Sequence, residues 1–186
     1  KDERGLLFKD GDYVKCLKPG KYNFNPFSKY TVHKCDVNDM LDTQGRNLSL
    51  FLDDEKLLEE LDIIDVQDHE TAVHFEDGKF SDVLNTGKYA FWNVMKKHEF
   101  ILHDLRDPEI KDTFDPIRYG VQGLNETFIC IDVPDQTKGI LYYDNVLKKV
   151  LGPGRYYFFN SPVNVSVRII DLRQQQLDMT ETFTGL

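Results

Sequence analysis

The stretch that decides the fold is residues 138–159, which read KGILYYDNVLKKVLGPGRYYFF. Two apolar runs flank Asp144-Asn145, and Pro153-Gly154 precedes a run of aromatic residues. Asp-Asn and Pro-Gly are turn sequences, because these residues tolerate or preset the backbone angles that reverse a chain. Short β-branched and aromatic runs between turns are typical of strands. The stretch therefore predicts a three-stranded antiparallel meander.

This stretch is the third of three copies that follow one another at an offset of 67 residues, and the earlier copies span residues 3–24 and 70–91. Repetition of this kind predicts tandem structural modules. Two kinds of residue recur in register. Those that we predict to form turns are Asp10, Asp77, Asp144, Gly20, Gly87 and Gly154. Those that we predict to form the repeated cores are Leu17, Leu84, Leu151, Tyr22, Tyr89 and Tyr156.

The fold that follows is mainly β, with three tandem small antiparallel modules at residues 1–60, 61–127 and 128–186. Residues 53–61 carry capping and early acidic residues with leucines on one face, which predicts a short helix of two turns or slightly more in the first link. The second link, 106–127, is rich in Pro and Gly and is predicted to be irregular. Related strands at 63–68 and 130–135 precede the second and third copies. The counterpart for the first copy would precede Lys1, so we expect the sequence to begin inside a repeat.

The formal net charge is -9, which argues against a nucleic-acid partner. The charge is uneven. Residues 1–35 carry eight basic and four acidic side chains, residues 137–173 carry six and two, and residues 36–136 carry nine and 24. No apolar run approaches the roughly 18 residues that a membrane-spanning helix needs. Three widely spaced cysteines do not indicate a disulfide framework, so we expect a reducing, cytoplasmic location.

Candidate chemical groups have simpler structural explanations. Cys35 aligns with Leu102 and Ile169, which predicts a small core residue. His98 and His103 could suggest a metal pair, but five positions on a strand place them on opposite faces. His74 aligns with Leu7 and Leu141, so we expect a semi-exposed strand position. The repeated aspartates fit hairpin turns better than acid–base or calcium chemistry. We predict no catalytic, cofactor-binding or metal-binding residue, and no enzyme activity.

Three stretches of the third copy carry a specific resemblance: KGILYY from Lys138, LGPGRYYFF from Leu151, and VRIIDLRQQQLDMT from Val167. The pattern resembles the entry into the stomatin/prohibitin (SPFH, band 7) domain, and most closely the bacterial slipin branch, where similar stretches are repeated ahead of that domain. The likeness covers nearly the whole chain as an N-terminal part, with the third module as the start of the SPFH domain.

The resemblance implies a non-enzymatic scaffold. Such proteins form large homo-oligomers, often on membranes, and modulate partner proteins such as proteases or channels. One departure matters: stomatins enter the membrane through an apolar hairpin before the domain, and this sequence has no such hairpin. We therefore expect membrane association only through segments outside this chain. The protein partners are not identified by the resemblance.

Two other functions stay open. A ligand-binding module would use exposed aromatic residues, and exposure of Tyr22, Tyr89 and Tyr156 would favour it. An enzyme would have its site in the link 106–127, and a pocket with a strongly perturbed acid or histidine would favour it. Burial of all three tyrosines without a converging polar pocket would favour the scaffold.

Overall fold

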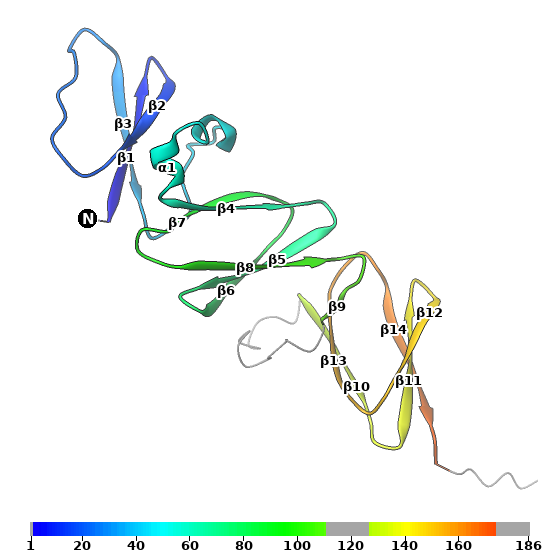
Figure 1. The fold of residues 1–186 in the computed structure, drawn as a ribbon. Coiled ribbons are helices and arrows are strands. Elements are labelled where there is room, and N and C mark those ends of the chain that lie inside the picture. The colour runs from blue at the N-terminus through cyan, green and yellow to red at the C-terminus, as the bar shows by residue number, and fades with distance from the viewer. Residues whose placement is uncertain (1, 111–126, 174–186) are drawn as a thin grey trace, which may run out of the picture. The chain divides into compact units, whose positions relative to one another are not determined.

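The structure is a computed structural model and describes residues 2–110 and 127–173. The described residues are mainly β, with 56% in strands and 5% in helices, and they form several small antiparallel sheets (Figure 1). By contacts the chain forms two units, which are described separately: residues 2–105, and residues 106–110 with 127–173. The strands are β1 (Glu3–Lys9), β2 (Asp12–Leu17), β3 (Tyr30–Asp36), β4 (Leu61–Val66), β5 (Glu70–Glu76), β6 (Lys79–Leu84), β7 (Gly87–Trp92), β8 (His98–Asp104), β9 (Glu109–Ile110), β10 (Phe128–Val133), β11 (Thr137–Tyr143), β12 (Val146–Leu151), β13 (Gly154–Phe159) and β14 (Val165–Asp171).

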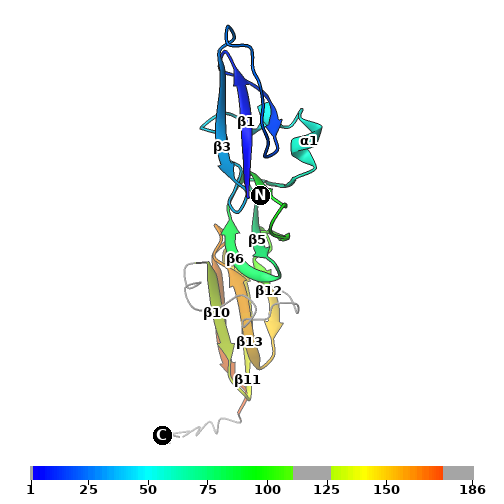
Figure 2. The same cartoon turned by 90° about the vertical axis from the view of Figure 1, so that its left-hand side faces the viewer.

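Each module is built on a three-stranded antiparallel sheet whose central strand opens a hairpin. The strand orders are β2-β1-β3, β6-β5-β8 and β12-β11-β14. The meander that the sequence predicted is wrong in its third strand. The aromatic strand β13 leaves the hairpin sheet and pairs with β10, as Figure 2 shows, and β7 likewise pairs with β4. Gly87 and Gly154 begin these strands at φ values of 152° and 149°, a backbone region that favours glycine and redirects the chain.

The second and third modules each have two layers. In the second, Ile64 and Val66 of β4 and Phe91 of β7 pack on Ala72 and Leu84 of the three-stranded sheet. The third module repeats this arrangement with a core made of Val133, Leu141, Tyr143, Leu151 and Phe158. In these two modules a strand pair therefore covers one face of the three-stranded sheet, and we call this face of each module the inner face. The opposite face is called the outer face.

The first module is built differently. Residues 20–25 align with β7 but form no strand, and the described residues supply no counterpart of β4. Its outer face is instead covered by the segment that follows it, through one core made of Leu6, Phe8, Cys35, Val37, Leu41, Phe51, Leu57, Leu61, Ala90 and Trp92. The first and second modules therefore share a hydrophobic core, and the predicted boundary at 60/61 lies inside the first unit.

The short helix predicted in the first link is present but shorter than expected. It is a single turn, α1 (Glu55–Leu58), capped by the Asp54 side chain and preceded by the 3-10 turn η1 (Leu48–Phe51). The expectation of two turns is wrong because Leu61 already pairs with Trp92 as the first residue of β4.

The gap-free repeat alignment is off by one residue in the last strand of the modules. Gly5 pairs with Lys34, whereas its counterpart Ala72 pairs with Leu102. The structural counterpart of Cys35 is therefore His103 and not Leu102, which corrects the alignment. The cause is the link before β3, which is one residue shorter than the link before β8. Cys35 is nevertheless buried in the shared core.

Candidate functional site

The repeated aspartates lie at hairpin turns. Asp10, Asp77 and Asp144 have φ values of 53°, 49° and 49°, and each is followed by a second residue with positive φ. Two consecutive residues of this kind form the tight turn whose twist matches paired strands. The Asp77 carboxylate accepts a hydrogen bond from the N–H of Lys97, and Asp144 does the same for Asn164. These carboxylates organise turns, and this accounts for their recurrence.

The repeated tyrosines stabilise the turn that follows the second strand of each hairpin. The hydroxyls of Tyr22, Tyr89 and Tyr156 each donate to the backbone carbonyl four residues earlier, at 2.7, 3.0 and 3.1 Å. Tyr89 and Tyr156 are half-buried beside their cores, whereas Tyr22 is exposed. The three therefore do not form a shared binding ladder. A Cβ added at Gly20, Gly87 or Gly154 would lie within 4 Å of these rings. Leu17, Leu84 and Leu151 are buried.

The candidate functional site is the outer face of the three-stranded sheets. In the first module this face is covered by residues 48–61, which we call the covering segment and which contribute Phe51, Leu57 and Leu61 to the shared core. Asp54 anchors the segment: its carboxylate accepts from the Tyr13 hydroxyl and the Cys16 N–H, both at 2.7 Å. Burial alone would raise the pKa of Asp54, but these hydrogen bonds and two from α1 outweigh it and lower the pKa.

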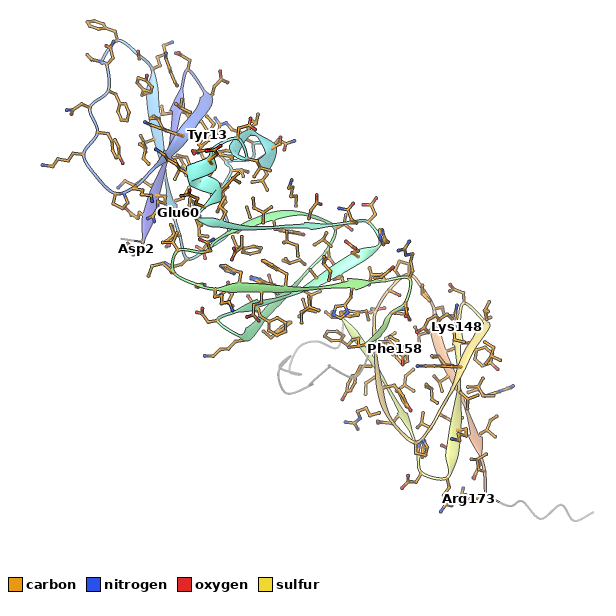
Figure 3. The ribbon with its side chains drawn as sticks, in the orientation of Figure 1. Asp2, Tyr13, Glu60, Lys148, Phe158 and Arg173 are labelled. Carbon is orange, nitrogen blue, oxygen red and sulfur yellow. The ribbon has the colours of Figure 1, made fainter. Side chains whose placement is uncertain are left out.

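A second carboxylate of the covering segment, that of Glu60, forms ion pairs at the edge of the same face. Glu60 accepts from Arg4 at 2.6 Å and forms an ion pair with Lys18 at 3.1 Å. Burial would raise the pKa of Glu60, but the two cations outweigh it and lower the pKa. Figure 3 shows Tyr13 and Glu60 beside the helical turns. An acidic segment with apolar residues thus lies on a sheet that supplies cations and strand-edge N–H groups.

In the third module, no described residues cover the outer face in the way that the covering segment does in the first module. Leu147 and Val150 occupy the positions of Tyr13 and Cys16 and are 59% and 61% exposed. Ile170, the structural counterpart of Cys35, is also exposed. Exposed neighbouring apolar side chains on one sheet indicate an interaction surface. We call Ile140, Tyr142, Leu147, Val150 and Ile170 the open outer face.

A groove lies on the inner face of the first module, where the other modules have their strand pair. It encloses about 430 Å³ and is lined by apolar and basic residues, among them Leu17, Lys18, Tyr22, Phe24 and Val32. Tyr22 and Phe24 are stacked with their ring centroids 6.3 Å apart. This is the aromatic exposure that the ligand-binding alternative requires, but it is confined to the first module.

A cluster of titratable side chains in the second module was missed by the sequence reasoning. His74 is 1% exposed, so the expectation of a semi-exposed position is wrong. It contacts His98 at 2.9 Å and Asp82 at 2.7 Å. A metal pair of His98 with His103 is not expected from the sequence, and the structure places His98 beside His74 instead, across β5 and β8. The pairing of β5 with β8 determines this contact. The sequence offered one indication of the cluster, because His74 occupies a repeat position that is leucine in the other two copies.

The candidate enzyme site in link 106–127 lies mostly outside the described residues. No helix in the described part of the chain is long and apolar enough to cross a membrane. Comparisons with protein-family models, with curated proteins and with solved structures found no match for this chain.

Proposed function

We propose that this chain is a non-enzymatic scaffold and assembly region, similar to the repeats ahead of the SPFH domain in slipin-like proteins. Its open outer face binds an acidic amphipathic segment of the same kind as the covering segment, and this joins β modules into a larger assembly. The full-length protein is then a homo-oligomer. One observation carries the proposal: the third module exposes the face that the first module buries.

The third module offers the same anchoring groups as the first. Lys138 occupies the position of Arg4, which binds Glu60 of the covering segment. Val150 occupies the position of Cys16 on an edge strand, and by the same register its N–H points outward as the Cys16 N–H does toward Asp54. Residues 137–173 carry six basic and two acidic side chains. Charge complementarity therefore favours an acidic partner segment.

The experiment is a titration of the whole chain with a synthetic peptide of residues 46–61, which leaves out residues 62–66 of β4. The covering segment already occupies the first module, so we expect one further equivalent to bind, and the double variant Leu147→Lys, Val150→Lys to bind at least tenfold more weakly. Val14→Lys is the matched control, because Val14 is an exposed apolar residue on β2. A peptide with Phe51 and Leu57 replaced by serine should not bind. Equal binding by the double variant and the original chain would contradict the proposal.

The cellular setting proposed with this function is the cytoplasm. All three cysteines, Cys16, Cys35 and Cys130, are free thiols, which supports a reducing compartment. Membrane association, where it occurs, is proposed to come from segments outside this chain.

A second candidate function is supported by the groove of the first module. In the other modules the same inner face is covered by a strand pair, whose first strands are β4 and β10. The groove would therefore bind an extended peptide next to residues 20–25, with Lys21 in the position of Arg155, which holds Asp132 at 2.6 Å in the third module. The test is binding of a peptide of residues 61–66. Replacing Phe24 with serine should weaken it, and unchanged binding would exclude this function.

A further inference from the structure

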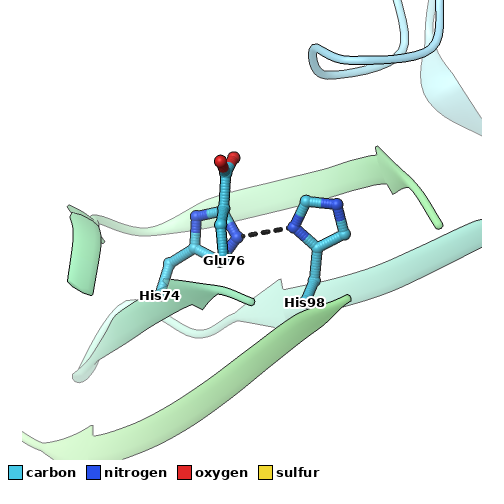
Figure 4. Close-up of side chains that lie close together, drawn as sticks. All are labelled: His74, Glu76 and His98. Atoms are coloured by element: carbon cyan, nitrogen blue, oxygen red, sulfur yellow. Dashed lines mark hydrogen bonds between the residues drawn. The ribbon is translucent and has the colours of Figure 1, made fainter. Parts of the chain in front are cut away.

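We propose that His74, His98 and Glu76 form a binding site for a divalent transition-metal ion. His74 and Glu76 are two positions apart on β5 and so share a face of the sheet, and Glu76 pairs directly with His98 on β8. One ligand atom from each of the three lies within 4.8 Å of the others. Figure 4 shows the two rings meeting edge to edge with Glu76 beside them. Two imidazoles and one carboxylate are a ligand set that suits zinc.

The outer nitrogens of both rings already have the partners that metal-binding histidines use. His74 Nδ1 lies 2.7 Å from the Asp82 carboxylate, and His98 Nε2 lies 3.0 Å from the carbonyl oxygen of Trp92. Both partners accept hydrogen bonds only, so they place the ring N–H groups on these nitrogens. In the neutral rings, His74 Nε2 and His98 Nδ1 then present lone pairs to each other. A hydrogen bond from the second ring nitrogen to a carboxylate or carbonyl is the usual support of a histidine ligand.

The gap between the two inner nitrogens is 2.9 Å. Two zinc–nitrogen bonds of about 2.0–2.1 Å span roughly 2.9 Å at a right angle and roughly 3.4 Å at the tetrahedral angle. The rings therefore need to separate by no more than about 0.5 Å. A cation between them, either a metal ion or a shared proton, satisfies both lone pairs, and the experiment below distinguishes the two.

The third potential ligand is currently engaged. Lys96 donates to one carboxylate oxygen of Glu76, Oε2, at 2.8 Å, and this contact raises the pKa of Lys96. Metal binding would compete with this ion pair. Lys96 also donates to the Asn38 carbonyl at 2.9 Å, so it keeps a partner when Glu76 turns to the ion.

The third module shows that the fold does not need this cluster. In the same positions it has Leu141 for His74, Tyr143 for Glu76, Val165 for His98 and Lys149 for Asp82. Leu141 and Tyr143 are buried there in an ordinary core. Burying polar groups costs free energy relative to such a core. The second module alone carries this ligand set among the described parts of the three modules, which favours a role in binding.

The experiment uses the whole chain, without a histidine tag and freed of metal by chelator. Zn²⁺ binding is measured by calorimetry, and Co²⁺ binding by visible absorption. We expect one equivalent of each metal to bind, with loss of binding in His74→Leu and in His98→Val, the residues of the third module. Asp82→Asn should bind about 10–100-fold more weakly, because the support of the His74 ring is lost. His33→Ala is the control, since His33 is a histidine beside a carboxylate in the first module.

Two further measurements keep the result interpretable. Emission of the single tryptophan, Trp92, which is buried in the shared core, reports whether each variant is folded. Glu76→Gln keeps the size of the side chain and should weaken binding without loss of the fold. Absence of stoichiometric Zn²⁺ and Co²⁺ binding to the original chain would overturn the proposal and leave the histidines as a proton-sharing pair. Binding that His74→Leu and His98→Val leave unchanged would overturn it too.

Discussion

Tyr89 donates a hydrogen bond from its hydroxyl to the carbonyl oxygen of Asn85, 3.0 Å away, and so closes the turn that leads into β7. Tyr89→Phe removes this bond while keeping the ring. We expect a loss of about 0.5–1.5 kcal/mol in the free energy of unfolding. Urea titration followed by Trp92 emission measures it, because both residues lie in the first unit. Tyr22→Phe, at an exposed ring, should cost less, and the reverse order would contradict the assigned role.

Leu84 lies in the core of the second module, where it is 6% exposed. Leu84→Ala should reduce the free energy of unfolding by about 2–5 kcal/mol, because it removes buried surface and leaves a cavity. Val14→Ala, at an exposed position on β2, is the control and should be nearly neutral. A loss below about 0.5 kcal/mol at Leu84 would place this leucine outside the core.

The stability of the first unit should fall in acid because of Asp54. The folded state lowers the pKa of this carboxyl, so its contribution is fully present above the unfolded value of about 3.9 and is lost as the pH falls through the lower folded value. We expect Asp54→Asn to show a smaller loss of stability between pH 6 and pH 3 than the original chain. The measurement is urea unfolding at several pH values. An identical pH dependence in both proteins would contradict the anchoring role of Asp54.

The three thiols should differ in reactivity. Burial raises the pKa of Cys16 to about 12 and that of Cys35 to about 11, whereas Cys130 is exposed. Because the thiolate is the reactive form, iodoacetamide at pH 8 should modify Cys130 first in the native protein. Peptide mapping by mass spectrometry gives the order, and urea should remove the difference. Modification of Cys16 or Cys35 at the rate of Cys130 in the native protein would contradict the described burial.

The sequence predicted the parts of the fold that depend on local chemistry. Asp10, Asp77 and Asp144 indicate the hairpin turns because their backbone preferences act within four residues. The partner of the aromatic strand β13 could not be predicted in this way. It pairs with β10, and the paired residues are more than twenty positions apart in the sequence. The predicted meander and the predicted second turn of α1 are wrong for the same reason, because pairing with distant strands overrides local preference.

The candidate sites show the same division. His74 stands out in the repeat alignment against Leu7 and Leu141, so its position could be noticed, but its partner His98 is 24 residues away and is set by strand register. The open outer face also could not be predicted from the sequence. Nothing in the sequence distinguishes Leu147 and Val150 from core residues, and the structure shows them exposed on the face that the covering segment buries in the first module.

The central claim is that the open outer face of the third module binds an acidic segment like residues 48–61. Hydrogen–deuterium exchange of the whole chain, with and without the 46–61 peptide, tests it most directly because it locates the contact. We predict slower exchange of the backbone amides in β12 when the peptide is present, and no such change in the Leu147→Lys, Val150→Lys variant. Binding of the peptide with no change in exchange at β12 would contradict the claim.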